Sequence, residues 1–268
     1  MDVSAETGAG AGSLLREWRR RRRMSQLDLA LEASISSRHL SFIETGRAHA
    51  SRDMILHLCE SLLVPLRERN RLLLSAGYAP IFPQRPLDDP ALAAARAAIE
   101  LVIAGHGPYP ALAVDRHWSL VTMNAAVGAL LAGVDPALLT PPVNVLRVSL
   151  HPLGIAPRVR NLGEWRAHLL ARLRQQIDIS ADPVLASLLQ ELAGYPAPAA
   201  PRATTGTGIV VPLELATEGG TLTLFSTTTV FGTPIDVTLS ELAIEAFYPA
   251  NAETEERLRA LHAPDGEP

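Results

Sequence analysis

The sequence predicts two domains of different class: an all-α domain of five short helices, then an α+β domain with an antiparallel sheet. Three observations support this fold class. Apolar residues recur at helical spacing in five short runs near the N-terminus. The stretch YAPIFPQRPLDDP follows them and, with four prolines, is typical of a linker. Beyond it, two strands, several helices and three strands follow in an order that does not repeat as βαβ units, which favours one antiparallel sheet covered by helices.

Each helix of the first domain has a recognisable start or end. The helices are expected over residues 14–24, 25–33, 36–46, 51–63 and 66–77. Ser25, Ser36 and Ser51 stand where an N-cap is expected, because a serine hydroxyl accepts a hydrogen bond from a free amide of the first turn. Gly46 and Gly77 suit left-handed residues at helix ends.

The second domain reads as a hairpin, a group of helices and three further strands. ALAVDRHWSLVTMN predicts two strands around a turn at Asp115-Arg116. Trp165, Leu169, Leu170 and Leu173 recur at helical spacing and predict one buried helix face. The expected helices are 91–105, 125–132, 163–177 and 182–194, and the later strands are 208–215, 220–231 and 234–247. The predicted organisation is a disordered tail over 1–12, a helical domain over 13–80, a linker over 81–88, an α+β domain over 89–262 and a tail over 263–268.

Charge is distributed unevenly along the chain. Residues 13–77 hold twelve arginines and seven acidic residues, a net charge of +5, so the rest carries −9 of the total of −4. A basic head on an acidic body is typical of a nucleic-acid-binding module joined to an ordinary domain. The single cysteine, Cys59, excludes an internal disulfide, and no signal peptide or membrane-spanning apolar run is recognisable. A cytoplasmic protein without membrane contact is therefore expected.

The stretch SSRHLSFIETGR, from Ser36 to Arg47, indicates how the basic head binds its partner. Two short helices joined by a tight turn, the second opening with small polar and cationic residues, predict a helix-turn-helix that reads double-stranded DNA in the major groove. Arg38 is expected to donate two hydrogen bonds to guanine, and Arg47 to contact phosphate. A helical bundle that does not bind DNA is the alternative. The predicted DNA-binding residues are Gln26, Ser36, Ser37, Arg38, Ser41, Arg47 and Arg52.

Several strings resemble known regulators. Ser25-Gln26, Leu29-Ala30 and LSFIETGR are similar to the Xre family of bacterial and phage repressors. The longer SSRHLSFIETGR with LRERNRLLLSAGYAP resembles the subgroup that carries an MmyB-like ligand-binding domain. NVLRVSLHPLGIAPRVRNLGEW and TPIDVTLSELAIEAFYP are similar to that domain itself. The resemblance therefore covers nearly the whole chain beyond its first dozen residues.

The resemblance implies particular features of both domains. In the first, it implies a structural bridge between Arg19 and Glu44, with Arg20 to Arg23 largely exposed. Ser34 departs from the family, which usually has glycine at this turn, so a left-handed backbone there would be strained. In the second, it implies a PAS-like sheet that holds an apolar ligand, with fatty acids the known kind.

A ligand pocket is expected in the second domain. Arg147, His151, Arg158, Arg160 and Asn161 lie in one segment between apolar runs and, with Trp165 behind them, predict a pocket mouth. Arg147 is best suited to a carboxylate, because a guanidinium offers two parallel donors. Taken singly, each polar residue is better explained by hydrogen bonding within the fold. The apolar lining is predicted from Met123, Leu130, Leu146, Leu150, Leu169, Leu173 and Leu224, for which plain core packing is the alternative.

The sequence contains no catalytic triad order, no nucleophile elbow, no HExxH and no phosphate-binding glycine loop. The histidines lack metal-ligand spacing, so neither an enzyme nor a metal site is predicted. A haem- or flavin-bearing sensor is a further alternative, for which His151 or His168 would be the axial ligand of a haem.

These observations together predict a ligand-responsive transcriptional regulator. It is expected to bind operator DNA as a homodimer held together by the C-terminal domain, and to sense a small apolar effector, a fatty acid or acyl compound. The alternative is a DNA-binding regulator whose C-terminal domain docks another protein and holds no ligand.

Overall fold

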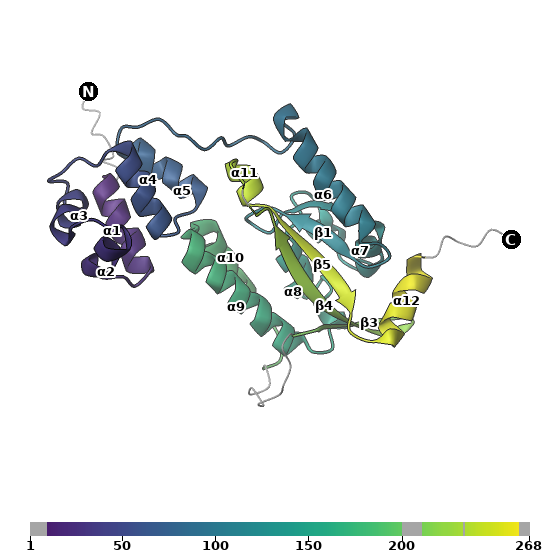
Figure 1. Ribbon diagram of the computed structural model, residues 1–268. Helices are drawn as coiled ribbons and strands as arrows, with labels where there is room; N and C mark the ends of the chain where they lie inside the picture. Colours follow the sequence, from purple (N-terminus) through teal and green to yellow (C-terminus); the bar gives the residue numbers. More distant parts are fainter. Residues whose placement is uncertain (1–9, 200–210, 233, 263–268) are drawn as a thin grey trace, which may run out of the picture. The chain divides into compact units, whose positions relative to one another are not determined.

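A computed structural model describes residues 10–199, 211–232 and 234–262 of the chain. The chain forms two compact units whose main boundary lies between Arg85 and Pro86. The first unit is all-α and the second is α+β, as predicted (Figure 1). Residues 1–9 of the tail predicted over 1–12, and the tail predicted over 263–268, lie outside the described residues.

The first unit contains the five predicted helices. The predicted serine N-caps are confirmed: Ser25 accepts a hydrogen bond from the amide of Asp28, Ser36 from His39 and Ser51 from Met54. Both predicted glycine ends are left-handed, with φ of +72° at Gly46 and +83° at Gly77. The helices are α1 (Ala11–Arg21), α2 (Gln26–Glu32), α3 (Ser37–Glu44), α4 (Arg52–Ser61) and α5 (Leu66–Ser75).

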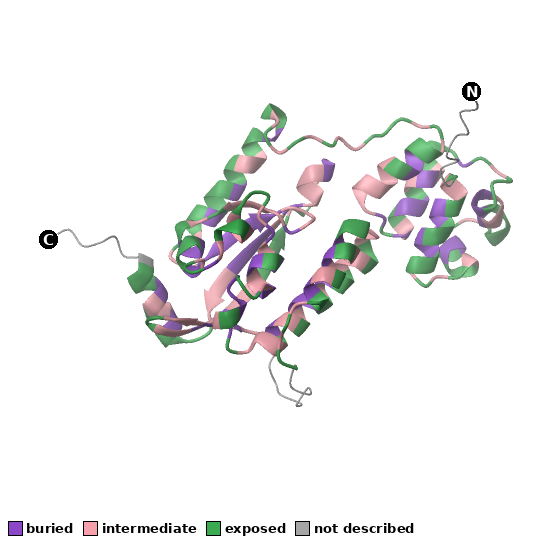
Figure 2. Ribbon diagram, turned by 180° about the vertical axis from the view of Figure 1, so that it is seen from behind, coloured by how far each residue is buried: buried purple, intermediate pink, exposed green. Residues whose placement is uncertain are grey.

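Apolar side chains from all five helices form the core of this unit. Leu15, Leu29, Leu40, Ile55 and Leu72 are each at most 1% exposed. Burying one such side chain contributes about 1.5–3 kcal/mol, so the core outweighs the weak intrinsic stability of helices this short. Figure 2 shows buried and exposed segments next to one another in the helices of this unit.

Two predicted boundaries of the helical unit are corrected. Helix α1 begins at Ala11, inside the segment expected to be a disordered tail. A Cβ atom at Gly12 would lie 2.2 Å from the carbonyl oxygen of Ile43, so the start of α1 packs directly on the end of α3. Ile81 and Phe82, predicted as linker, are held by the side chain of Asn70, which accepts from both amides at 3.1 Å.

The second unit is built on a five-stranded antiparallel sheet with the order β2-β1-β5-β4-β3. This sheet confirms the predicted antiparallel α+β domain and agrees with a PAS-like fold. The predicted hairpin is present, although its turn is longer than expected, from Asp115 to Ser119. The strands are β1 (Ala111–Val114), β2 (Leu120–Met123), β3 (Leu213–Thr217), β4 (Gly220–Val230) and β5 (Ala243–Pro249).

Helices cover both faces of the sheet, because successive strand residues alternate between them. Ala111 and Ala113 pack with Ile99 and Ile103 of α6 on one face. Leu112 and Val114 belong to the larger core on the other face, which α7 to α10 complete. The helices of this unit are α6 (Ala93–Gly105), α7 (Ala125–Leu130), α8 (Val145–Leu150), α9 (Leu162–Ser180), α10 (Pro183–Ala193), α11 (Val237–Ser240) and α12 (Ala252–His262), with short 3-10 turns at Pro90–Leu92, Pro136–Leu139 and Ala156–Arg158.

Two element predictions in this unit are wrong or incomplete. The strand expected over 234–247 starts only at Ala243, and α11 precedes it. Ala243, the first residue of β5, pairs with both Val114 and Val230, and the described residues of the expected strand that precede it belong to no strand pair. Part of this segment forms α11, whose backbone groups bond within the helix instead. Helices α8 and α12 were not predicted from the sequence. Part of the strand expected over 208–215 lies outside the described residues.

Candidate functional site

The turn between α2 and α3 positions a polar helix start on the surface. Ser34 has φ of +52°, as its place at the turn required, and the amides of Ser34 and Ile35 close the end of α2 by donating to Leu31 and Ala30. The first turn of α3 then presents Ser37 and Arg38 to solvent. This geometry is the one that a helix needs to enter a DNA groove with its N-terminal side chains foremost.

A buried ion pair fixes α3 against the rest of the unit. Arg19 donates to Glu44 through Nε at 2.6 Å and Nη2 at 2.8 Å, and the Glu44 side chain is fully buried. Two further hydrogen bonds support the pair: Arg19 Nη1 donates to the carbonyl of Met24, and Gln26 Nε2 donates to Glu44 at 2.8 Å. The bridge predicted between Arg19 and Glu44 is therefore present, and it joins α1, α2 and α3.

The protonation state of Glu44 follows from these contacts. Burial alone would raise the pKa of its carboxyl, but the hydrogen bonds from Arg19 and Gln26 outweigh burial, and the net pKa lies below its usual range. The hydrogen bond to Glu44 in turn raises the pKa of Arg19. Both groups are therefore charged at neutral pH, and their ion pair joins α1 to α3.

The remaining predicted DNA-binding residues are distributed around α3. Arg38 is exposed, with its guanidinium 5.4 Å from the ring of Phe42. Arg47 and Arg52 are exposed beyond the end of α3. Ser36 caps the helix and Ser41 is half-buried one turn further on. Gln26 donates to Glu44 through one of the two hydrogens of its amide.

One expectation for the arginine run is wrong. Arg22 is not simply exposed, because it donates to the carbonyls of Leu62 at 2.8 Å and Leu63 at 3.0 Å, beyond the end of α4. Its guanidinium also lies over the ring of Trp18 at 5.4 Å. Carbonyls at a helix end lack partners within the helix, so a cation placed there stabilises it. Arg20, Arg21 and Arg23 are exposed as expected.

The second unit contains an apolar cavity of about 110 Å³ between the sheet and α7, α8 and α9. Its walls are almost entirely hydrocarbon and aromatic. The sheet contributes Leu112, Leu213 and Phe247, and two tryptophans, Trp118 and Trp165, also face it. The helices and the loops beside them contribute Val127, Leu130, Leu131, Val145, Leu146, Val148, Ile155 and Leu169. Such a lining, with few polar groups, is characteristic of a small-molecule site.

Polar groups in the cavity wall are few. Arg172 of α9 and Glu245 of β5 form an ion pair, with Nη2 to Oε1 at 2.7 Å and Nη1 to Oε2 at 3.2 Å. Thr228 of β4 joins this pair, because its hydroxyl accepts from Arg172 and donates to Glu245. Ser149 accepts from the indole of Trp165 at 2.9 Å, and Ser226 completes the set.

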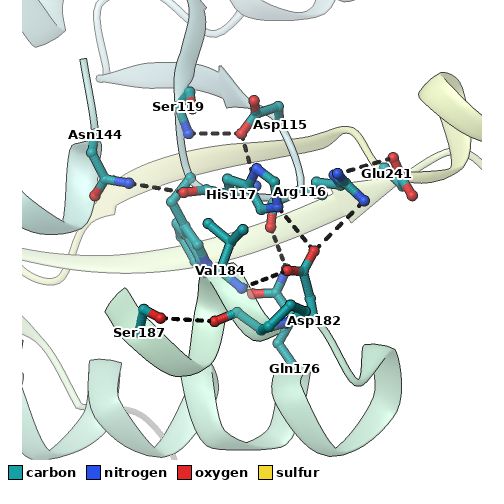
Figure 3. A network of polar contacts seen from close by, with 12 residues as sticks. Asp115, Arg116, His117, Ser119, Asn144, Gln176, Asp182, Val184, Ser187 and Glu241 are labelled. Atoms are coloured by element: carbon teal, nitrogen blue, oxygen red, sulfur yellow. Dashed lines mark hydrogen bonds and ion pairs between the residues drawn. The ribbon is translucent and has the colours of Figure 1, made fainter. Parts of the chain in front are cut away.

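A network of polar contacts surrounds the β1–β2 turn (Figure 3), which also carries Trp118 of the cavity wall. The carboxylate of Asp115 accepts the amides of His117 and Ser119, each at 2.8 Å. His117 Nε2 lies 2.9 Å from Asp182, the N-cap of α10. The Trp118 indole donates to Gln176 of α9 at 2.7 Å, and Trp118 itself is left-handed, with φ of +66°. The turn is therefore bound to both α9 and α10.

Comparison with protein families agrees with both sites. A helix-turn-helix domain matches residues 11–72, and the MmyB-like transcription regulator ligand binding domain matches residues 95–261. The chain belongs to this MmyB-like family. It is a helix-turn-helix transcription regulator with an MmyB-like ligand-binding domain, as the sequence resemblance implied. No curated protein matches the chain.

Part of the predicted lining is found in the cavity of the MmyB-like domain. Met123, Leu130, Leu146, Trp165 and Leu169 all line it. The other predicted apolar residues do not: Leu150, Leu173 and Leu224 are at most 1% exposed and belong to the solid core. Sequence spacing identifies a buried face but does not show which of its residues border a space.

The polar residues predicted at the pocket mouth are not among those that line the cavity. Arg147, expected to hold a ligand carboxylate, instead forms a two-bond pair with Glu191 at 2.8 and 2.7 Å. Arg158 donates to the carbonyl of Leu130, and Asn161 is bonded to Pro212 and Glu214. His151 accepts from the amide of Leu153. Hydrogen bonding within the fold accounts for all four.

Arg160, the fifth of this group, is exposed at the surface, where its amide donates to the carbonyl of Glu214. His168, the other residue considered as a haem ligand, is stacked on Trp165, and burial lowers its pKa. Among the described residues, no group of three or more His, Cys, Asp or Glu is placed to hold a metal ion. No helix in the described ranges is long and apolar enough to cross a membrane.

The polar group of the cavity was not predicted from the sequence. Arg172 and Glu245 are far apart in the chain, and only the antiparallel pairing of β4 with β5 and the packing of α9 bring them together. One signal was available: Glu245 interrupts the apolar run AIEAF, which is unusual for a buried strand position.

Proposed function

We propose that this regulator binds operator DNA as a homodimer of the Xre type and that a small apolar effector in the cavity of its MmyB-like domain changes its DNA affinity. The observation that carries the proposal is the hydrocarbon-walled cavity inside a domain joined to a helix-turn-helix. An effector changes DNA affinity only if it binds the DNA-competent and DNA-incompetent states of the protein with different affinity.

DNA recognition is proposed to follow the two kinds of contact that α3 and its exit loop offer. Arg38, in the first turn of α3, reads a base edge, with Ser37 and Ser41 beside it. Gln26, Ser36, Arg47 and Arg52 hold the phosphates. This division is supported by the exposure of Arg38 and Arg47 and by the buried Arg19–Glu44 bridge, which fixes the helix that carries Arg38.

Helix α6 is proposed as part of the two-fold contact. Leu101 is 75% exposed and Val102 is 51% exposed, and Ala94, Ala97 and Ala98 lie exposed on the same helix. Contiguous apolar surface that is exposed in a single chain commonly marks the place where another molecule binds. The substitution Leu101→Glu should shift sedimentation from dimer to monomer, whereas Leu153→Glu, at a residue 56% exposed in the same domain, should leave it unchanged. An unchanged dimer in Leu101→Glu excludes α6 from the contact.

The ligand proposal is tested with the intact protein. Mass spectrometry of an organic extract from purified, denatured protein should find an apolar compound in near-stoichiometric amount. Val148→Phe fills the cavity and should abolish its recovery. Val159→Phe is the matched control, because Val159 is equally buried but does not line the cavity. Extracts of both variants with the same compound content as the wild type would contradict binding at this site.

The alternative, a domain that docks a protein without a ligand, makes the opposite prediction. In that case no compound is recovered, and Val148→Phe and Val159→Phe affect operator binding alike.

A further inference from the structure

The polar end of the cavity carries both charges of an ion pair, and this limits the kind of ligand that fits. Of the described residues that line the cavity, only Arg172 and Glu245 are charged. The Glu245 side chain is 5% exposed and that of Arg172 is 25% exposed. Their charges cancel within one pair of hydrogen bonds, so the polar end presents no net positive charge to an incoming anion.

An ionised fatty acid is poorly matched to such a site. Its carboxylate would approach Arg172 next to the carboxylate of Glu245, and two carboxylates that share a site cannot both remain ionised without cost. Displacing Glu245 would leave a buried carboxylate without its partner, which is strongly unfavourable. The aromatic face of Trp118, 5.1 Å from the Arg172 guanidinium, further occupies the cation.

Arg172 nevertheless has hydrogen-bonding capacity left. A guanidinium carries five N–H groups, and Arg172 uses one on Nη1 and two on Nη2 for Glu245 and Thr228. The hydroxyl of Ser226, also in the cavity wall, has no hydrogen-bond partner among the described residues. These donors suit an uncharged acceptor such as a carbonyl oxygen.

We propose that the cavity takes an apolar molecule whose single polar head is uncharged and accepts hydrogen bonds, as in a fatty amide, ester, lactone or ketone, rather than an ionised fatty acid. This inference rests on the proposed ligand-binding function and specifies the ligand for that same cavity. Arg172 donates to the carbonyl of the head, Glu245 holds Arg172 in place and repels carboxylates, and the hydrocarbon wall takes the tail.

The other titratable group near this end does not alter the charge balance at neutral pH. His168 lies one turn before Arg172 on α9, and its ring is stacked on Trp165 at a centroid distance of 5.6 Å. Burial and the neighbouring Arg172 lower the pKa of His168, so its ring is uncharged at neutral pH. Measurements at neutral pH therefore report the ion pair alone.

Titration calorimetry of the delipidated full-length protein compares decanamide, methyl decanoate and decanoate, which share one tail and differ in the head. The two neutral compounds should bind at least about tenfold more tightly than decanoate. Decanoate binding as tightly as decanamide, or more tightly, overturns the inference. If none of the three binds, the ligand-binding function itself fails, so the two failures are distinguishable.

The substitution Glu245→Gln tests the cause. It keeps the shape and removes the negative charge, so decanoate should gain at least about tenfold in affinity while decanamide changes little. Glu191→Gln is the matched control, because it removes the carboxylate of the surface pair with Arg147, outside the cavity, and should change neither ligand. No gain of decanoate affinity in folded Glu245→Gln overturns the role of Glu245.

A second variant keeps the test decisive if Glu245→Gln does not fold. The joint replacement of Arg172→Met and Glu245→Leu removes both charges, and buried ion pairs often tolerate such apolar replacement. Decanamide should then bind more weakly, because the Arg172 guanidinium that donates to its carbonyl is absent. The affinity for decanoate should not rise. Unchanged affinity for decanamide shows that Arg172 does not bind the head.

Discussion

The two units each contain a buried arginine–glutamate pair, but the pairs differ in what surrounds them. In the helical unit, Arg19 and Glu44 lie between helices, and the carbonyl of Met24 and the side chain of Gln26 each form one further hydrogen bond to the pair. In the MmyB-like domain, Arg172 and Glu245 border a cavity, and the side chain of Arg172 is 25% exposed, against 9% for that of Arg19. The same pair of residues is thus a structural bridge where it is fully enclosed and a candidate ligand contact where one side is open.

The largest effect is expected from a substitution that breaks the buried Arg19–Glu44 pair. Glu44→Ala leaves the Arg19 guanidinium buried without its partner, which should lower the free energy of unfolding of the helical unit by about 3–5 kcal/mol. Differential scanning calorimetry should show this unit melting earlier while the MmyB-like domain is unaffected. The control Glu17→Ala removes an exposed pair with Arg21 and should cost less than about 0.5 kcal/mol. Equal melting of both variants would falsify the bridge as a source of stability.

The next largest effect concerns operator binding by α3, the helix that the Arg19–Glu44 bridge holds in place. Arg38→Ala should cost about 1–3 kcal/mol of operator binding and relax the preference at one base position. Arg47→Ala should weaken binding to all sequences alike and reduce the salt slope by about 0.9, the value for one phosphate contact. Fluorescence anisotropy with a set of operator variants at several salt concentrations separates the two. Identical base profiles for both variants would show that Arg38 does not read a base.

A smaller effect is expected in the pH dependence of stability, which tests the Arg19–Glu44 pair. Because the pKa of Glu44 is lowered in the folded state, its contribution is complete above the unfolded value of about 4.3 and is lost as pH falls through the lowered folded value. Stability of the helical unit should therefore fall with acidification in this range, and Glu44→Gln should show a shallower fall. The measurement is urea denaturation followed by circular dichroism between neutral pH and about pH 3. Parallel pH profiles would mean that Glu44 does not titrate as described.

The two units can also be compared as separate fragments, by their oligomeric state and their operator binding. Residues 1–80 alone should be monomeric and bind operator weakly, and an apolar ligand should not change that affinity, because the cavity lies in the other unit. Residues 84–268 alone should dimerise. Analytical ultracentrifugation and anisotropy test both statements. A monomeric C-terminal fragment would exclude the proposed dimer contact, and a ligand effect on the isolated head would exclude coupling through the MmyB-like domain.

Local chemistry in the sequence determined most of the helical unit. Ser25, Ser36 and Ser51 cap helices as predicted, and Gly46 and Gly77 end them, because capping depends on a few neighbouring residues. Apolar spacing also predicted the buried face of α9 and the β1–β2 hairpin. These features depend on interactions between residues that are close together in the chain, so the order and spacing of residue types in the sequence are enough to predict them.

Only the tertiary structure decided which residues border the cavity. Arg147 and Arg172 are both arginines on helices of the same domain, yet one pairs with Glu191 at the surface and the other with Glu245 at the cavity wall. Likewise, Gly12 precedes the first predicted helix and is needed there because α1 approaches the Ile43 carbonyl of α3. Such outcomes depend on contacts between segments far apart in the chain, for which a single sequence carries no periodic signal.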